Sequence, residues 1–158
     1  MNTPPRRRRS VLAAAGGVVV GLAGCLGDRL PEPDEGDALV AELWIRDRAT
    51  GEIVADTHHD HWHGSLPAVR LGSAREFDAE FIDANRETIR LGDDEPFEVT
   101  ATVAEASTDD TLTVESRGTH VQLTGEDTGE AELVFRLSEA DDTVWEAPPT
   151  PIEVTAPT

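Results

Sequence analysis

A dense histidine segment is the part of this sequence whose residue types and spacing are suited to chemistry. Four of the chain's five histidines lie within six consecutive positions, His58, His59, His61 and His63. Neutral imidazole is the commonest protein ligand for borderline metals, and Asp56 and Asp60 add possible oxygen ligands. The segment therefore predicts a metal site in a His-rich loop over residues 56–64. The alternative is a solvated polar loop whose histidines bind nothing.

The backbone conformation decides how many of these side chains can share one ion. In an extended chain His59, His61 and His63 lie on one face, with neighbours roughly 6.6 Å apart, while the residues between them face the other way. In a helical turn, His59 and His63 become neighbours instead. Both arrangements supply two ligands, and a third needs a bend or a residue from elsewhere. The spacing matches neither a zinc finger nor an HExxH motif.

His120 is the one histidine outside the segment. Val121 and Leu123 are expected to face a core, so His120 faces outward from its strand or toward a neighbouring loop. It is either an ordinary exposed histidine or the residue that completes the metal site where loops meet at one end of the domain.

Alternating apolar and polar residues predict strands over most of the chain after residue 38. Phe77, Ala79 and Phe81 form one such pattern, and Phe97, Val99, Ala101 and Val103 form another. Similar short patterns recur at intervals near ten residues, with turn residues between them, and no convincing helix appears. The sequence therefore predicts an all-β domain over residues 39–156, an antiparallel immunoglobulin-like β-sandwich of eight or nine short strands. Trp44 and Trp145 are expected in its core, and Trp62 is expected to pack on the sandwich.

Two short motifs support this fold class. Val121–Gly125 contains Leu-Thr-Gly, and Gly129–Leu133 has the pattern Gly-x-Ala-x-Leu. Together they resemble the tail of bacterial immunoglobulin-like modules. The resemblance covers about a quarter of the chain and implies a fold without implying a chemistry.

The N-terminal residues describe an export signal over residues 1–24. A basic head precedes an apolar run that is too short for a stable bilayer span. Arg8 and Arg9, followed by Ser-Val-Leu, resemble the twin-arginine export motif. Leu22-Ala23-Gly24-Cys25 resembles the lipobox of bacterial and archaeal lipoproteins, which implies cleavage before Cys25 and a lipid on its sulfur. The alternative for this lone cysteine is a buried structural thiol.

Residues 25–38 then read as a short acidic, Pro-rich tether between the membrane and the folded domain. Together with the export signal and the lipobox, this predicts an exported protein. We expect it to be lipid-anchored at the outer face of the cytoplasmic membrane.

Charge narrows the possible partners. The net charge is −19, and cleavage before Cys25 would leave nine arginines against 32 acidic residues, a net charge of −23 with no lysine. Such a composition resembles proteins of extremely halophilic archaea, in which high salt screens repulsion between carboxylates. Nucleic acid is excluded as an expected partner because binding it needs a basic face.

These features predict a cell-surface lipoprotein that binds a divalent transition metal for capture, sensing or delivery to a transporter. After cleavage no methionine remains and Cys25 is lipidated, so a soft Cu(I) site is disfavoured. Zn²⁺ is expected, with Cu²⁺ or Ni²⁺ as alternatives. The rival interpretation is a structural or adhesive module without a metal role. An enzyme is not expected, because no motif supplies a general base beside a substrate cleft.

Overall fold

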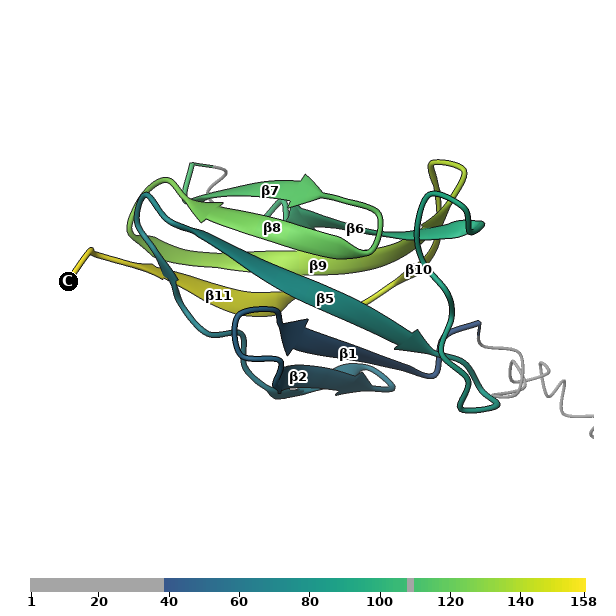
Figure 1. Cartoon of the computed structure of the whole chain (residues 1–158). Helices are drawn as coiled ribbons and strands as arrows, with labels where there is room; N and C mark the ends of the chain where they lie inside the picture. Colours follow the sequence, from purple (N-terminus) through teal and green to yellow (C-terminus); the bar gives the residue numbers. More distant parts are fainter. Residues whose placement is uncertain (1–38, 108–109) are drawn as a thin grey trace, which may run out of the picture. The chain divides into compact units, whose positions relative to one another are not determined.

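A computed structural model describes residues 39–107 and 110–158 of the chain. These residues form two β-sheets (Figure 1). The first sheet has six strands in the order β3-β2-β1-β5-β8-β7. Their bounds are β1 Glu42–Asp47, β2 Ile53–His58, β3 His61–Gly64, β5 Ala74–Ile82, β7 Leu112–Ser116 and β8 His120–Gly125. All neighbouring strands in this sheet are antiparallel.

The second sheet is built around the long strand β9 (Gly129–Glu139). Strand β6 (Phe97–Val103) pairs with β9, as do β11 (Thr150–Thr155) near the start of β9 and β10 (Asp142–Glu146) near its end. The two-residue strand β4 (Val69–Arg70) extends the sheet by pairing in parallel with β11. The remaining pairs in this sheet are antiparallel.

The core lies between the inward faces of the two sheets. Phe77 and Phe81 on β5 and Phe135 on β9 are fully buried, together with Leu43 and Ile45 on β1. Burying side chains of this size stabilises a fold by about 1.5–3 kcal/mol each. The described residues confirm the predicted all-β sandwich of mainly antiparallel strands, with eleven strands where eight or nine were expected.

The tryptophans differ in part from the sequence prediction. Trp44 was expected in the core but lies on the outer face of β1, because Leu43 and Ile45 take the inward positions on either side of it. Its indole Nε1 donates a hydrogen bond of 3.1 Å to Glu42 Oε2 on the same face. Trp145 is half-buried, with its ring 5.8 Å from that of Phe81. The alternation of side chains along β1 therefore places Trp44 on the outer face although it is hydrophobic.

A buried carboxylate holds the turn that leads from β1 into β2. Asp47 is 1% exposed and accepts hydrogen bonds from the Arg75 guanidinium and, at 2.9 Å, from the backbone N–H of Ala49. Burial alone would raise the pKa of Asp47, but the hydrogen bonds and the charge of Arg75 hold that pKa below its ordinary value. Asp47 is therefore ionised at neutral pH and fixes the turn between β1 and β2.

The signal peptide predicted at 1–24, with Arg8 and Arg9, and the tether at 25–38, with Cys25, lie outside the described residues. The part of the chain that the structure describes contains no helix of membrane-spanning length and hydrophobicity.

Candidate metal centre

The histidine segment is a β-hairpin at the edge of the six-stranded sheet, where a loop was predicted. Strands β2 and β3 pair so that Asp56 lies opposite His63, Thr57 opposite Trp62 and His58 opposite His61. His59 and Asp60 form the two-residue turn, and His59 has a left-handed φ of 59°. A left-handed backbone is typical of such tight hairpin turns.

The hairpin gathers three histidines on one face. Ala55 and Thr57 are buried, so Asp56 and His58 point to the outer side of the sheet. On β3, Trp62 is turned inward and His61 and His63 are exposed on the outer side. A straight strand would have grouped His59 with His61 and His63. The turn interrupts the alternation after His58, so His58 replaces His59 in the group.

Two contacts on the inner face anchor the hairpin to the rest of the domain. The Trp62 ring lies 6.1 Å from the Phe135 ring on the opposite sheet, and its Nε1 donates a 2.8 Å hydrogen bond to the carbonyl of Pro148. The predicted packing of Trp62 on the sandwich is confirmed. At the end of β3, Gly64 has a φ of 78°, and a Cβ there would lie 2.3 Å from the Val54 carbonyl oxygen. Glycine is therefore required at this close approach of β3 to β2.

Two carboxylates lie beside the outward-facing histidines. Glu42 Oε1 is 3.6 Å from Nδ1 of His58, and Asp60 Oδ1 is 2.7 Å from Nδ1 of His61. The side chains of His58 and His61 are 54% and 69% exposed, so both rings are largely open to solvent.

The side chains do not converge on one point as they stand. The ring centroids of His61 and His63 are 6.1 Å apart, and those of His58 and His59 are 4.6 Å apart. Over residues 39–107 and 110–158, no three His, Cys, Asp or Glu side chains are already placed to hold a metal ion. Binding at the hairpin would therefore require the exposed imidazoles to rotate, which costs little for solvated side chains.

His120 lies apart from the hairpin. It begins β8 opposite Asp78 of β5, whereas His58 belongs to the row that meets β5 at Ile82. Four residues along the sheet and three strands across it separate these positions by about 19 Å. The Nε2 atom of His120 is instead 3.8 Å from Glu76 Oε1. The structure does not bring His120 together with the other four histidines.

Glu42 is the neighbour that sequence reasoning missed. It lies beside the histidines because β1 pairs with β2 and places Glu42 opposite His58. The alternation along β1 could have shown that Glu42 faces outward with Trp44. The register that places Glu42 opposite His58 cannot be predicted from the local sequence.

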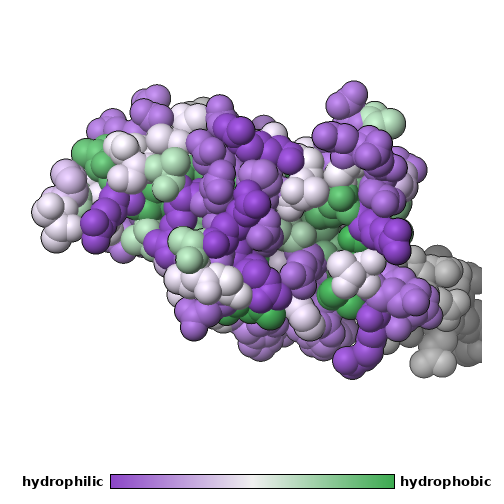
Figure 2. Space-filling view, viewed as in Figure 1, coloured by the Kyte–Doolittle hydropathy of each residue, from purple (hydrophilic) through white to green (hydrophobic). Residues whose placement is uncertain are grey.

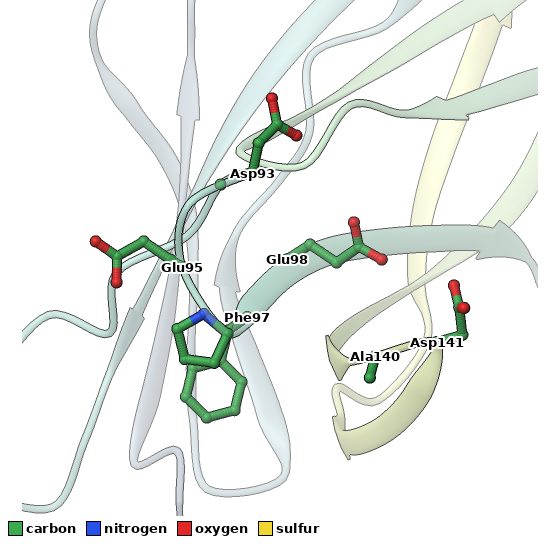
Figure 3. Close-up of a pocket in the computed structure, with 8 residues that line it drawn as sticks. Asp93, Glu95, Phe97, Glu98, Ala140 and Asp141 are labelled. Carbon is green, nitrogen blue, oxygen red and sulfur yellow. The ribbon is translucent and has the colours of Figure 1, made fainter.

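A hollow of about 450 Å³ lies elsewhere, between the loop before β6 and the β9–β10 turn. Half of its eight lining residues are acidic, namely Asp93, Glu95, Glu98 and Asp141, and none is a histidine. Glu95 points to the opposite side from Glu98 and Asp141 (Figure 3). The visible surface of the domain is largely hydrophilic (Figure 2), so acidic residues at this hollow match their surroundings.

No family model matches the chain, and no curated protein matches it. One solved structure, that of domains 4 and 5 of the S-layer protein SbsC, aligns with a TM-score of 0.41 and 12% sequence identity. The alignment covers 72% of this chain and 77% of that one.

Proposed function

We propose that this chain is a cell-surface lipoprotein that binds a divalent transition metal on the outer face of the β2–β3 hairpin, with Zn²⁺ favoured. The observation that carries the proposal is the hairpin register, which puts His58, His61 and His63 on one exposed face beside Asp56. The tight turn has made neighbours of side chains that an uninterrupted strand would have separated.

The spacing on this face suits chelation. Residues directly opposite on paired strands have Cβ atoms about 4.5–5.5 Å apart, which applies to His58 with His61 and to Asp56 with His63. An ion above the face can be reached by imidazole nitrogens at about 2.1 Å after side-chain rotation. Three nitrogens and one carboxylate oxygen form a donor set that suits Zn²⁺, and Cu²⁺ and Ni²⁺ are the alternatives.

The position of the hairpin favours exchangeable binding. The core is made of apolar side chains from both sheets and includes none of the four histidines, so we expect the fold to form without an ion. The exposed face also leaves coordination positions open to water or to a ligand from another molecule. These properties suit capture, sensing or delivery, with a metal transporter as the partner. We propose no catalytic role, because an open sheet edge does not exclude water from a substrate.

The location rests on the N-terminal motifs. Arg8 and Arg9 would direct twin-arginine export, and a lipid on Cys25 would hold the acidic domain at the outer face of the membrane.

The test is a calorimetric titration with zinc of the exported chain in which Cys25 is replaced by Ser. Replacing His58, His61 and His63 together by Ala should lower the affinity by about 100-fold or more, because all three nitrogen ligands are lost. His120→Ala is the matched control, since it removes a histidine from the same sheet face about 19 Å away. Binding should weaken in acid, because protons compete with the metal for the imidazole nitrogens.

A chain that binds no zinc, copper or nickel would contradict the proposal. It would leave the alternative of a structural or adhesive module whose histidines are incidental. An equal loss of affinity in His120→Ala would instead show that the hairpin face alone does not account for binding.

A further inference from the structure

We infer that Glu42 and Asp60 are positioning residues that hold Nδ1–H of His58 and His61, so that each imidazole presents Nε2 to the metal. The inference rests on the proposed function and deepens it, because it names the ligand atoms and changes the role of Asp60. Asp60 was predicted as a ligand. Its carboxylate instead contacts the ring nitrogen of a ligand.

Glu42 is held in place by a hydrogen bond from Trp44. Its Oε2 accepts the 3.1 Å hydrogen bond from Trp44 Nε1, and its Oε1 faces Nδ1 of His58 at 3.6 Å. The Glu42 side chain is only 21% exposed, in contrast to the open His58. Rotation of the exposed imidazole would shorten the 3.6 Å separation to a hydrogen bond. The carboxylate is therefore the fixed member of the pair.

Asp60 makes the corresponding contact from within the turn. The left-handed backbone of His59 completes a two-residue turn, and the Asp60 carboxylate lies 2.7 Å from Nδ1 of its neighbour His61. Both groups are well exposed, so this contact orients the ring more weakly than Glu42 orients His58.

A carboxylate fixes which nitrogen can bind a metal. Neutral imidazole carries one N–H, and a carboxylate oxygen can only accept it. When Nδ1 donates to Glu42 or Asp60, Nε2 keeps its lone pair and becomes the ligand. Histidine ligands in metal sites commonly donate the other ring N–H in this way, which raises their basicity and fixes their orientation.

The residues form a row across three strands. Glu42 of β1 lies opposite His58 of β2, which lies opposite His61 of β3. The next row along the same face contains Trp44, Asp56 and His63. To bring the two Nε2 atoms to one ion, the rings must still turn about their carboxylate contacts, and His63 and Asp56 of the second row lie on the same outer face. The arrangement therefore leaves Asp56, not Asp60, as the carboxylate available for direct coordination.

The experiment reads the imidazole tautomers before any metal is added. Nitrogen-15 NMR of the Cys25→Ser chain at about pH 8, well above the ordinary histidine pKa of about 6.5, distinguishes Nδ1–H from Nε2–H rings. We expect His58 and His61 to be Nδ1–H. Glu42→Ala should shift His58 toward a mixture while leaving His61 unchanged, and Asp60→Ala should do the reverse. Zinc affinity should fall by about 10-fold or more in Glu42→Ala.

Glu80→Ala is the charge-matched control, because Glu80 lies on the same outer face of the sheet and pairs with Arg46 at 3.1 Å. It removes one negative charge without touching a histidine. An Nε2–H ring at His58 in the parent chain, or an equal loss of zinc affinity in Glu80→Ala, would overturn the positioning role even if zinc binds. The expected tautomers in a chain that binds no metal would overturn the proposed function instead.

Discussion

Replacing Gly64 by alanine tests whether the close approach of β3 to β2 holds the hairpin together. The added Cβ would lie 2.3 Å from the Val54 carbonyl oxygen and 3.2 Å from the Ala55 Cα. Both atoms belong to the backbone of a paired strand, so neither can rotate away. The strands must separate locally, and the Ser65 N–H loses its 3.1 Å hydrogen bond to the same Val54 oxygen.

Gly51→Ala is the matched control. Gly51 has a φ of 76°, close to the 78° of Gly64, but a Cβ there would meet no atom within 4 Å. Both variants therefore share the cost of a left-handed alanine, about 1–2 kcal/mol. Only Gly64→Ala adds the steric clash, which we set at about 2 kcal/mol from the typical cost of overpacking together with one lost hydrogen bond.

The assay is thermal unfolding of the two variants and the parent chain in the same buffer. At about 4 °C for each kcal/mol, Gly64→Ala should melt about 8 °C below Gly51→Ala. Zinc affinity should fall only in Gly64→Ala, because His61 and His63 lie on the displaced strand. Equal melting temperatures would show that β3 moves away from β2 at no cost, and that the hairpin is not rigid.

Three further predictions concern location, salt and pH. Cys25→Ser should release the protein from the membrane fraction, and a variant that stays bound would contradict lipid anchoring. With a net charge of about −23 after cleavage, the domain should lose stability in dilute buffer and regain it in molar salt. A circular dichroism spectrum and a melting temperature that stay unchanged between about 0.1 M and 2 M salt would count against the halophilic interpretation. Asp47→Asn should cost about 2 kcal/mol at pH 7, because it leaves the Arg75 charge without its buried partner. The folded-state pKa of Asp47 is lowered, so its contribution is present above the unfolded value near 4 and is lost as pH falls through the folded pKa. Denaturation at pH 7 and pH 3 should show that the difference in unfolding free energy between parent and variant is smaller in acid. An equal difference at both pH values would refute the role of the ion pair.

The sheets were predictable where one face of a strand is apolar. Strands β5, β6 and β9 follow the alternation at 77–82, 97–103 and 131–137 closely. Strand β3 was missed because it has four residues, three of them polar or glycine, and a composition typical of a loop. It pairs with β2 because Trp62 reaches Phe135 and Pro148, which are distant in sequence. Tertiary contacts therefore decided the local structure.

The sequence predicted where the candidate site lies along the chain, but not how its side chains are arranged. Composition alone located the histidines, but their facing depends on a two-residue turn that reverses the expected grouping of His58 and His59. The distance to His120 depends on β1 and β5 lying between β2 and β8 (Figure 1). Strand order is set by the whole fold, so local sequence patterns could not predict that His120 lies far from the other four histidines.

A synthetic peptide spanning Asp56 to Gly64 separates the contribution of composition from that of the fold. It contains four of the five histidines, with Asp56 and Asp60, but lacks Glu42 and the contacts of Trp62. An isolated two-stranded hairpin is at best marginally stable in water, so the peptide must lose conformational entropy when it chelates.

In the domain, pairing with β1 and the anchoring of Trp62 have already ordered the strands, and we expect calorimetry to give tighter zinc binding than for the peptide. Equal affinities would mean that the histidines act as an unstructured chelator. The register, the turn and the carboxylates beside the rings would then have no part in binding, although the two sheets would still present the segment to solvent.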